Sequence, residues 1–113
     1  QLKNQQISLR DRTLALQPPL EVIQILPEAY FGFELQEATH VQKVAYQLFP
    51  NSVYKKVQLE VSSDGTKWIT VPAEEKKEIM QAAVKQVVKY IRVRNASSEN
   101  LNFKVVLFNA EIK

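Results

Sequence analysis

A predicted β-hairpin near the middle of the chain constrains the fold more than any other feature of the sequence. Over residues 56–62, hydrophobic and polar residues alternate, which is the two-residue period of a strand with one buried face. The next residues, Ser63-Asp64-Gly65-Thr66, are typical of a turn, because Gly65 can adopt a positive φ and Asp64 can hydrogen-bond to its own backbone. Residues 66–71 then return as the partner strand. Two strands joined by a tight turn indicate a β-rich domain.

Strand patterns also cover most of the chain after residue 20. They lie at residues 21–26, 30–35, 40–48, 90–94 and 103–112. Short strands with regular turns predict an all-β sandwich of about eight strands, formed by residues 20–113. Residues 1–19 are predicted to be a lead-in segment or an edge strand, and their sparse apolar residues are Ile7, Leu9, Leu14 and Leu16. The predicted core contains Leu59, Val61, Phe33, Tyr46, Ile91, Phe108 and Trp68.

Composition argues against catalysis, metal binding and nucleic-acid binding. The 113 residues contain no cysteine, one histidine (His40) and two glycines, which argues against thiolate chemistry, a His-rich metal site and a P-loop. The only aspartates are Asp11 and Asp64, whereas a calcium loop needs several oxygen ligands. The net charge of +3 comes from dispersed lysines and arginines, without the basic stripe of a nucleic-acid binder. We therefore expect no catalytic residue, cofactor, metal or nucleic-acid partner. The longest apolar run, residues 105–108, is too short to span a membrane.

Two segments resemble the discoidin domain, also called the coagulation-factor (F5/8) type C domain. The first runs from Val57 to Val71 and contains the turn over residues 63–66 followed by Trp68; the second is Val88-Lys89-Tyr90-Ile91-Arg92-Val93-Arg94. The strand over residues 30–35 is similar to an upstream strand of the same family. The resemblance covers about residues 20–112 and implies a galactose-binding-like jelly-roll β-sandwich.

Within that family, the chain looks most like the C-terminal domain of gut-Bacteroides β-N-acetylhexosaminidases of the O-GlcNAcase and chitobiase types. The similar features are the hairpin, the strand from Val88 to Arg92, the loop Asn95-Ala96-Ser97 and a last strand that ends at Lys113. This resemblance implies a non-catalytic accessory domain, mainly structural, that packs on the catalytic domain of a secreted or periplasmic glycoside hydrolase. It implies a bacterial protein in the periplasm, at the cell surface or outside the cell. The first residue is Gln rather than Met, as expected for a fragment of a longer chain.

A carbohydrate-binding module is the alternative function, and its candidate contacts lie on two loops, residues 49–54 and 95–102. Both loops combine amide and hydroxyl groups with a nearby aromatic or apolar residue, which suits the recognition of sugar hydroxyls. The candidate sugar-binding residues are Phe49, Asn51, Tyr54, Asn95 and Asn100. A third hypothesis is an adhesion or membrane-binding domain, for which Phe49 is the one candidate spike at a loop tip.

Trp68 and Arg92 each allow two interpretations. Trp68 is either a core residue, which is our expectation, or a platform on which a sugar stacks. Arg92 is expected to be the partner of an ion pair or of the backbone rather than a ligand contact.

Residues 74–91 also allow two interpretations. Their apolar residues follow a helical period, and Glu74 and Glu75 suit a helix N-terminus, so periodicity alone predicts a helix over residues 73–86. The discoidin resemblance predicts a strand, a turn and a second strand instead, and we adopt that prediction.

Overall fold

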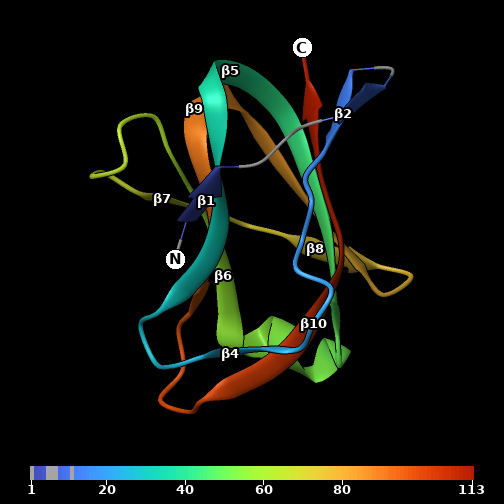
Figure 1. Cartoon of the computed structure of the whole chain (residues 1–113), viewed down its shortest axis with the longest axis vertical. Coiled ribbons are helices and arrows are strands. Elements are labelled where there is room, and N and C mark those ends of the chain that lie inside the picture. Colours follow the sequence, from blue (N-terminus) through green and yellow to red (C-terminus); the bar gives the residue numbers. More distant parts are fainter. Residues whose placement is uncertain (1, 5–7, 11) are drawn as a thin grey trace.

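The computed structural model describes residues 2–4, 8–10 and 12–113, and this part of the chain forms ten strands and one short 3-10 helix (Figure 1). The strands are β1 Leu2–Asn4, β2 Ser8–Arg10, β3 Thr13–Ala15, β4 Ile23–Ile25, β5 Tyr30–Phe49, β6 Val57–Ser62, β7 Ile69–Val71, β8 Glu74–Lys76, β9 Ile79–Asn95 and β10 Leu101–Ile112. The helix η1 spans Asn51–Lys56. The all-β prediction is confirmed. Ile7 and Asp11 lie outside the described residues. No helix in the described part is long and apolar enough to cross a membrane.

The two longest strands, β5 and β9, each contribute to both layers of a sandwich. They pair with each other along most of their length, with a break in register between Glu34 and Thr39. In one layer, the first part of β5 pairs with β1 and with the last part of β9. The last part of β9 pairs in turn with β6, and β6 pairs with β7. In the other layer, the rest of β5 pairs with β10, β10 pairs with β3, and β3 pairs with β2. Strand β8 pairs with the start of β9. Figure 1 shows the sheet folding over where β5 bends, so that one continuous sheet covers both sides of the core.

The predicted hairpin is present as β6 and β7, with Leu59 opposite Val71 and Val61 opposite Ile69. Gly65 has φ of 81°, and Asp64 accepts backbone hydrogen bonds from Lys67 at 3.0 Å and Thr66 at 2.9 Å. These two hydrogen bonds hold the pKa of the Asp64 carboxyl well below its usual range. The turn therefore forms by the chemistry that the sequence predicts.

The prediction of strand, turn and strand over residues 74–91 is confirmed as well. Strand β8 and the start of β9 form a hairpin whose two-residue turn consists of Lys77 and Glu78. The buried side chains of this part of β9 are Met80, Ala82, Val84 and Val88. The first three follow the two-residue period of a strand, and Lys85, with φ of 53°, interrupts that period. The apparent helical period arose because exposed residues of β9 are also apolar.

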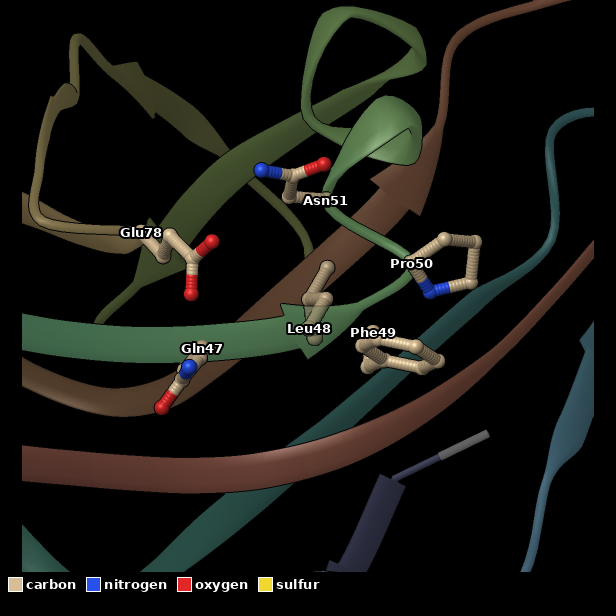
Figure 2. Close-up of a pocket in the computed structure, with 6 residues that line it drawn as sticks. All are labelled: Gln47, Leu48, Phe49, Pro50, Asn51 and Glu78. Atoms are coloured by element: carbon tan, nitrogen blue, oxygen red, sulfur yellow. The ribbon is translucent and has the colours of Figure 1, made fainter.

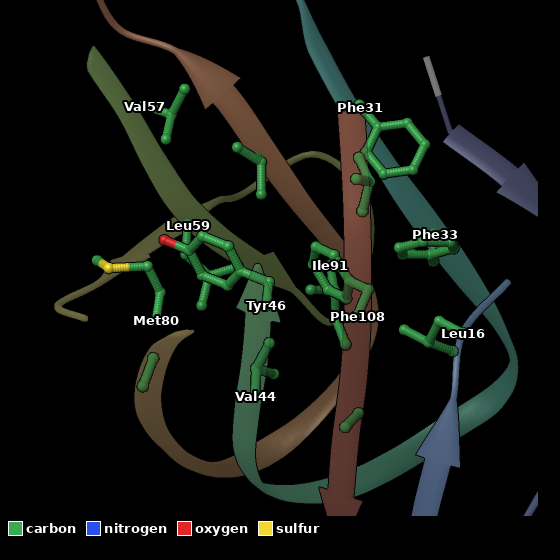
Figure 3. Close-up of a cluster of buried hydrophobic side chains, with 14 of the residues drawn as sticks. Leu16, Phe31, Phe33, Val44, Tyr46, Val57, Leu59, Met80, Ile91 and Phe108 are labelled. Carbon is green, nitrogen blue, oxygen red and sulfur yellow. The ribbon is translucent and has the colours of Figure 1, made fainter. Parts of the chain in front are cut away.

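The core lies between the two layers and is centred on aromatic rings (Figure 3). The Phe108 ring contacts Phe33 at a centroid distance of 4.8 Å and stacks on Tyr46 at 5.7 Å. Six of the seven predicted core residues are buried: Phe33, Tyr46, Leu59, Val61, Ile91 and Phe108. The prediction for Trp68 is wrong, since this residue precedes β7 and is only half-buried.

Candidate functional site

A small pocket lies at the end of β5, at the start of one of the two candidate loops (Figure 2). Its volume is about 110 Å³, and its lining residues are Gln47, Leu48, Phe49, Pro50, Asn51 and Glu78. The topology explains its position. Tyr46 and Met80 form the last residue pair between β5 and β9, because β9 begins there at the tight turn with β8. Strand β5 runs on to Phe49, so that its last residues have an edge that β9 does not cover.

Tyr54 fills the space beneath that open edge. Its side chain is buried, and its hydroxyl accepts a hydrogen bond from the Leu48 backbone N–H at 3.0 Å and donates one to the Glu78 backbone carbonyl. Burial raises the pKa of the Tyr54 hydroxyl above its usual range. Tyr54 therefore ties the two sides of the pocket together, and it presents no free hydroxyl to a sugar. The sequence analysis names Tyr54 as a sugar contact, whereas in the structure it does not line the pocket and its hydroxyl bonds to Leu48 and Glu78.

Apart from the buried Leu48, the residues around the pocket are exposed or half-buried, and three of them carry unused polar side chains. The Phe49 side chain is 69% exposed, and Asn51 and Glu78 are exposed too. Within the described part of the chain, the side chains of Gln47, Asn51 and Glu78 make no hydrogen bond or ion pair. Figure 2 shows the Asn51 amide and the Glu78 carboxylate on one side of the β5 ribbon, with the Phe49 ring beside Pro50. An aromatic ring that lines the same pocket as free amide and carboxylate groups suits a sugar, because the ring can pack on C–H groups while the polar groups bind hydroxyls.

The second candidate loop lies at the same end of the sandwich but is built differently. It is attached to η1 by a hydrogen bond from the Ala96 N–H to the Lys56 carbonyl at 2.9 Å and by an ion pair between Lys56 and Glu99 at 2.7 Å. Asn95 is fully buried. Its amide donates to the carbonyls of Ile25 and Glu99 and accepts from Ser97. Asn95 therefore holds the loop in shape.

Asn100 is exposed, but it does not line the pocket. The structure thus brings together Phe49 and Asn51 of the five predicted residues. It adds Gln47 and Glu78, which the sequence interpretation did not propose as ligand contacts. Glu78 comes from a hairpin turn without glycine or asparagine, so no turn signal in the sequence pointed to its position.

Trp68 lies in a different environment, on the outer face of the β5–β9–β6 layer. The Arg92 guanidinium carbon is 3.7 Å from the centroid of the Trp68 ring and 4.4 Å from that of Tyr30. The Arg92 Nε donates to the Glu60 carboxylate at 2.8 Å, and the Arg94 Nε donates to its other oxygen at 3.1 Å. The expectation that Arg92 is an ion-pair residue is confirmed.

Gly32 makes room for this arrangement. It lies opposite Arg92 in the β5–β9 pair, and a Cβ atom at residue 32 would be 2.7 Å from the Cβ of Arg92. A side chain at residue 32 would therefore displace Arg92 from its place beside the rings. Trp68 covers a charged network on the outside of the sheet, which explains why a large aromatic residue lies outside the core.

The N-terminal part of the chain matches a family model of known proteins. Residues 1–47 match the family model of carbohydrate binding module family 32, a galactose-binding-like family related to discoidin domains. The match covers β1 to β4 and most of β5, and it ends at Gln47, at the edge of the pocket. No curated protein matches the chain.

The match and the discoidin resemblance rest mainly on different residues, since the hairpin over residues 57–71 and the strand from Val88 to Arg94 lie outside the match and only the strand over residues 30–35 lies within it. The match does not extend to the β-N-acetylhexosaminidases, and this narrower resemblance stays a prediction. The N-terminal part of the chain is therefore similar to the carbohydrate binding modules of family 32.

Proposed function

We propose that this domain is a non-catalytic carbohydrate-binding module that holds a sugar at the pocket beside Phe49. The observation that carries the proposal is that the 69% exposed Phe49 and the unused polar side chains of Gln47, Asn51 and Glu78 line the same pocket. The similarity of residues 1–47 to a family of carbohydrate binding modules supports it independently. Asn100 of the second loop is exposed at the same end of the sandwich and is proposed as a peripheral contact to a longer glycan.

The size of the pocket sets the expected strength of binding. Pockets that enclose a drug-sized ligand have volumes of roughly 300–1,000 Å³, whereas this one has about 110 Å³. It can hold one edge of a single sugar ring and leaves the remainder in water. We expect a millimolar dissociation constant, equivalent to about −4 kcal/mol.

Weak binding of this kind is useful on a larger protein. We propose that the parent chain is a bacterial glycoside hydrolase, of the β-N-acetylhexosaminidase type, that works in the periplasm, at the cell surface or outside the cell. A module attached to the catalytic domain raises the effective concentration of glycan near it without tight binding. This proposal rests on the sequence resemblance.

A mainly structural role is the second candidate, and exposed apolar residues favour it. Leu20 is 85% and Val22 is 66% exposed, directly before β4. Apolar side chains at this exposure suit burial against a neighbouring domain of the parent chain. In that role the domain would stabilise the parent enzyme, and the two roles are compatible because the pocket and these residues are different surfaces.

Calorimetry on the 113-residue chain tests the sugar-binding proposal. We expect N-acetylglucosamine, galactose or N-acetylgalactosamine to bind in the millimolar range, and Phe49→Ala to abolish the binding. Val87→Ala is the matched control, since Val87 is a 51% exposed apolar residue that does not line the pocket. If the wild-type chain binds none of these sugars and no glycan on an array, the sugar-binding proposal is wrong and the structural role gains support.

A further inference from the structure

The turn that carries Glu78 has a backbone that its residues do not favour. Lys77 and Glu78 form the two-residue loop between β8 and β9, with φ values of 52° and 69°. Loops of this type favour glycine, asparagine or aspartate, because other side chains place Cβ too close to the backbone when φ is positive. A glycine at residue 78 would relieve this strain. The turn instead has a glutamate at a position whose backbone favours glycine, asparagine or aspartate.

Contacts with η1 hold this turn beside the pocket. The Tyr54 hydroxyl donates to the Glu78 carbonyl while it accepts from the Leu48 N–H, so that the turn is fixed against the end of β5. The Glu78 side chain then reaches the pocket on the same side of the β5 ribbon as the Asn51 amide (Figure 2). The position of the Glu78 backbone at the pocket is therefore set by its contact with Tyr54.

The carboxylate is also free to bind a ligand. Glu78 makes no ion pair with any of the described residues, in contrast to Glu60 and Glu99. An ionised carboxylate accepts hydrogen bonds on two oxygens and donates none, so it suits two neighbouring hydroxyl groups. The negative charges of Glu75 and Glu78 also raise the pKa of Tyr54, after the larger effect of burial.

We propose that Glu78 determines the class of sugar that the pocket accepts. It accepts hydrogen bonds from adjacent hydroxyls of a neutral sugar, and its charge disfavours sugars that carry a carboxylate or a sulfate. This inference rests on the proposed sugar-binding function and adds the chemical class of the ligand to it. Asn51 offers both a donor and an acceptor to the same ring, whereas Glu78 supplies the discrimination by charge.

The test compares galactose with galacturonic acid, which differ by a carboxylate in place of a hydroxymethyl group, in NMR titrations of the 113-residue chain at neutral pH and low salt. We expect galactose to bind the wild-type protein about 5-fold or more tightly than galacturonic acid, as an exposed like-charge contact of about 1 kcal/mol would give. Glu78→Gln keeps the shape and removes the charge, so this ratio should fall to near one. Glu74→Gln is the matched control, because Glu74 is an exposed carboxylate of the same hairpin that does not line the pocket.

A second variant separates binding from folding. Glu78→Gly should unfold at the same or a higher temperature than wild type, because glycine suits φ of 69°, and should bind galactose more weakly. The inference is overturned if both sugars bind the wild-type protein equally, if galacturonic acid binds more tightly, or if Glu78→Gln leaves the ratio unchanged. Those results would leave the proposed function standing, whereas the absence of binding by either sugar would remove both.

Discussion

The outer-face network around Trp68 and the pocket beside Phe49 use similar residue types in opposite ways. In the network, the Glu60 carboxylate binds Arg92 and Arg94, and Arg92 lies against the rings of Trp68 and Tyr30. In the pocket, Phe49 and Glu78 have no comparable partner among the described residues, although an aromatic ring and a carboxylate are present in both places. The difference shows that these residue types do not themselves define a binding site. We infer that a binding site needs aromatic and charged side chains whose interactions are not already satisfied within the protein.

This comparison also predicts which substitutions affect stability and which affect binding. Groups that satisfy one another stabilise the fold, so their removal lowers the free energy of unfolding. Groups left unused contribute little to the fold, so their removal is expected to change the free energy of unfolding by about 0.5 kcal/mol or less.

The largest effect is expected for Glu60→Ala. The Glu60 side chain is only 7% exposed, and its loss leaves the guanidinium groups of Arg92 and Arg94, at 14% and 20% exposure, without their shared counter-charge. We expect the free energy of unfolding to fall by about 3 kcal/mol in urea denaturation. Glu28→Ala is the matched control, since Glu28 pairs with the same Arg94 but is 78% exposed. Its effect should stay below about 1 kcal/mol. Equal effects of the two substitutions would show that burial does not strengthen the network.

A smaller loss is expected for Trp68→Ala. Removal of a buried aromatic side chain costs about 3–5 kcal/mol, but Trp68 is half-buried and its main contacts are Arg92 and the rings of Tyr30 and Tyr90. We expect a loss of about 2 kcal/mol by thermal or chemical denaturation, with sugar binding unchanged. A folded Trp68→Ala variant that no longer binds sugar would move the binding site to the outer face.

The smallest of the three effects on stability is expected for Tyr54→Phe, which removes the hydrogen bonds to the Leu48 N–H and the Glu78 carbonyl. We expect a loss of about 1 kcal/mol and weaker sugar binding, because the turn of Glu78 is no longer tied to β5. Val53→Ala, on the same helix, is the control: it should lower stability without a comparable loss of affinity. Unchanged affinity in Tyr54→Phe would show that the hydroxyl does not position the pocket.

The same hydroxyl predicts the behaviour at alkaline pH. Burial raises the pKa of Tyr54 above the value that this side chain has in the unfolded chain, which is about 10. The protonated Tyr54 hydroxyl therefore makes its full contribution to the free energy of unfolding below about pH 10. That contribution is lost as the pH rises further, because the unfolded state releases the Tyr54 proton more easily than the folded state does. Tyr54→Phe should show a shallower decline, and the remaining decline reflects Tyr46, whose pKa burial also raises.

Much of the fold could be predicted from local patterns. The hairpin over residues 57–71 has both strand alternation and turn residues, and six of the seven expected core residues follow from strand faces. The position of Trp68 differs from the prediction because a strand pattern does not show that the outer face carries a half-buried arginine for an indole to cover. That information depends on the pairing of β6 with β9.

The pocket could be predicted only in part. Phe49 and Asn51 line the pocket, and the sequence points to them because an aromatic residue precedes a turn rich in polar groups. Asn95 and Tyr54 have the residue types of a sugar site, but tertiary hydrogen bonds use their polar atoms. Glu78 reaches the pocket through a turn without a sequence signal and through the contact with Tyr54. Contacts between distant parts of the chain decide which polar groups stay free.

The most direct test of the contrast between the pocket and the Trp68 network is an NMR measurement of the backbone and indole N–H signals of the whole chain. The signals are compared without sugar and with a saturating concentration of the tightest-binding sugar. We predict shifts at Gln47, Phe49, Asn51 and Glu78, while the signals of Trp68, Tyr90 and Arg92 stay in place. Shifts concentrated at Trp68 and Arg92, with the pocket residues unchanged, would contradict the account.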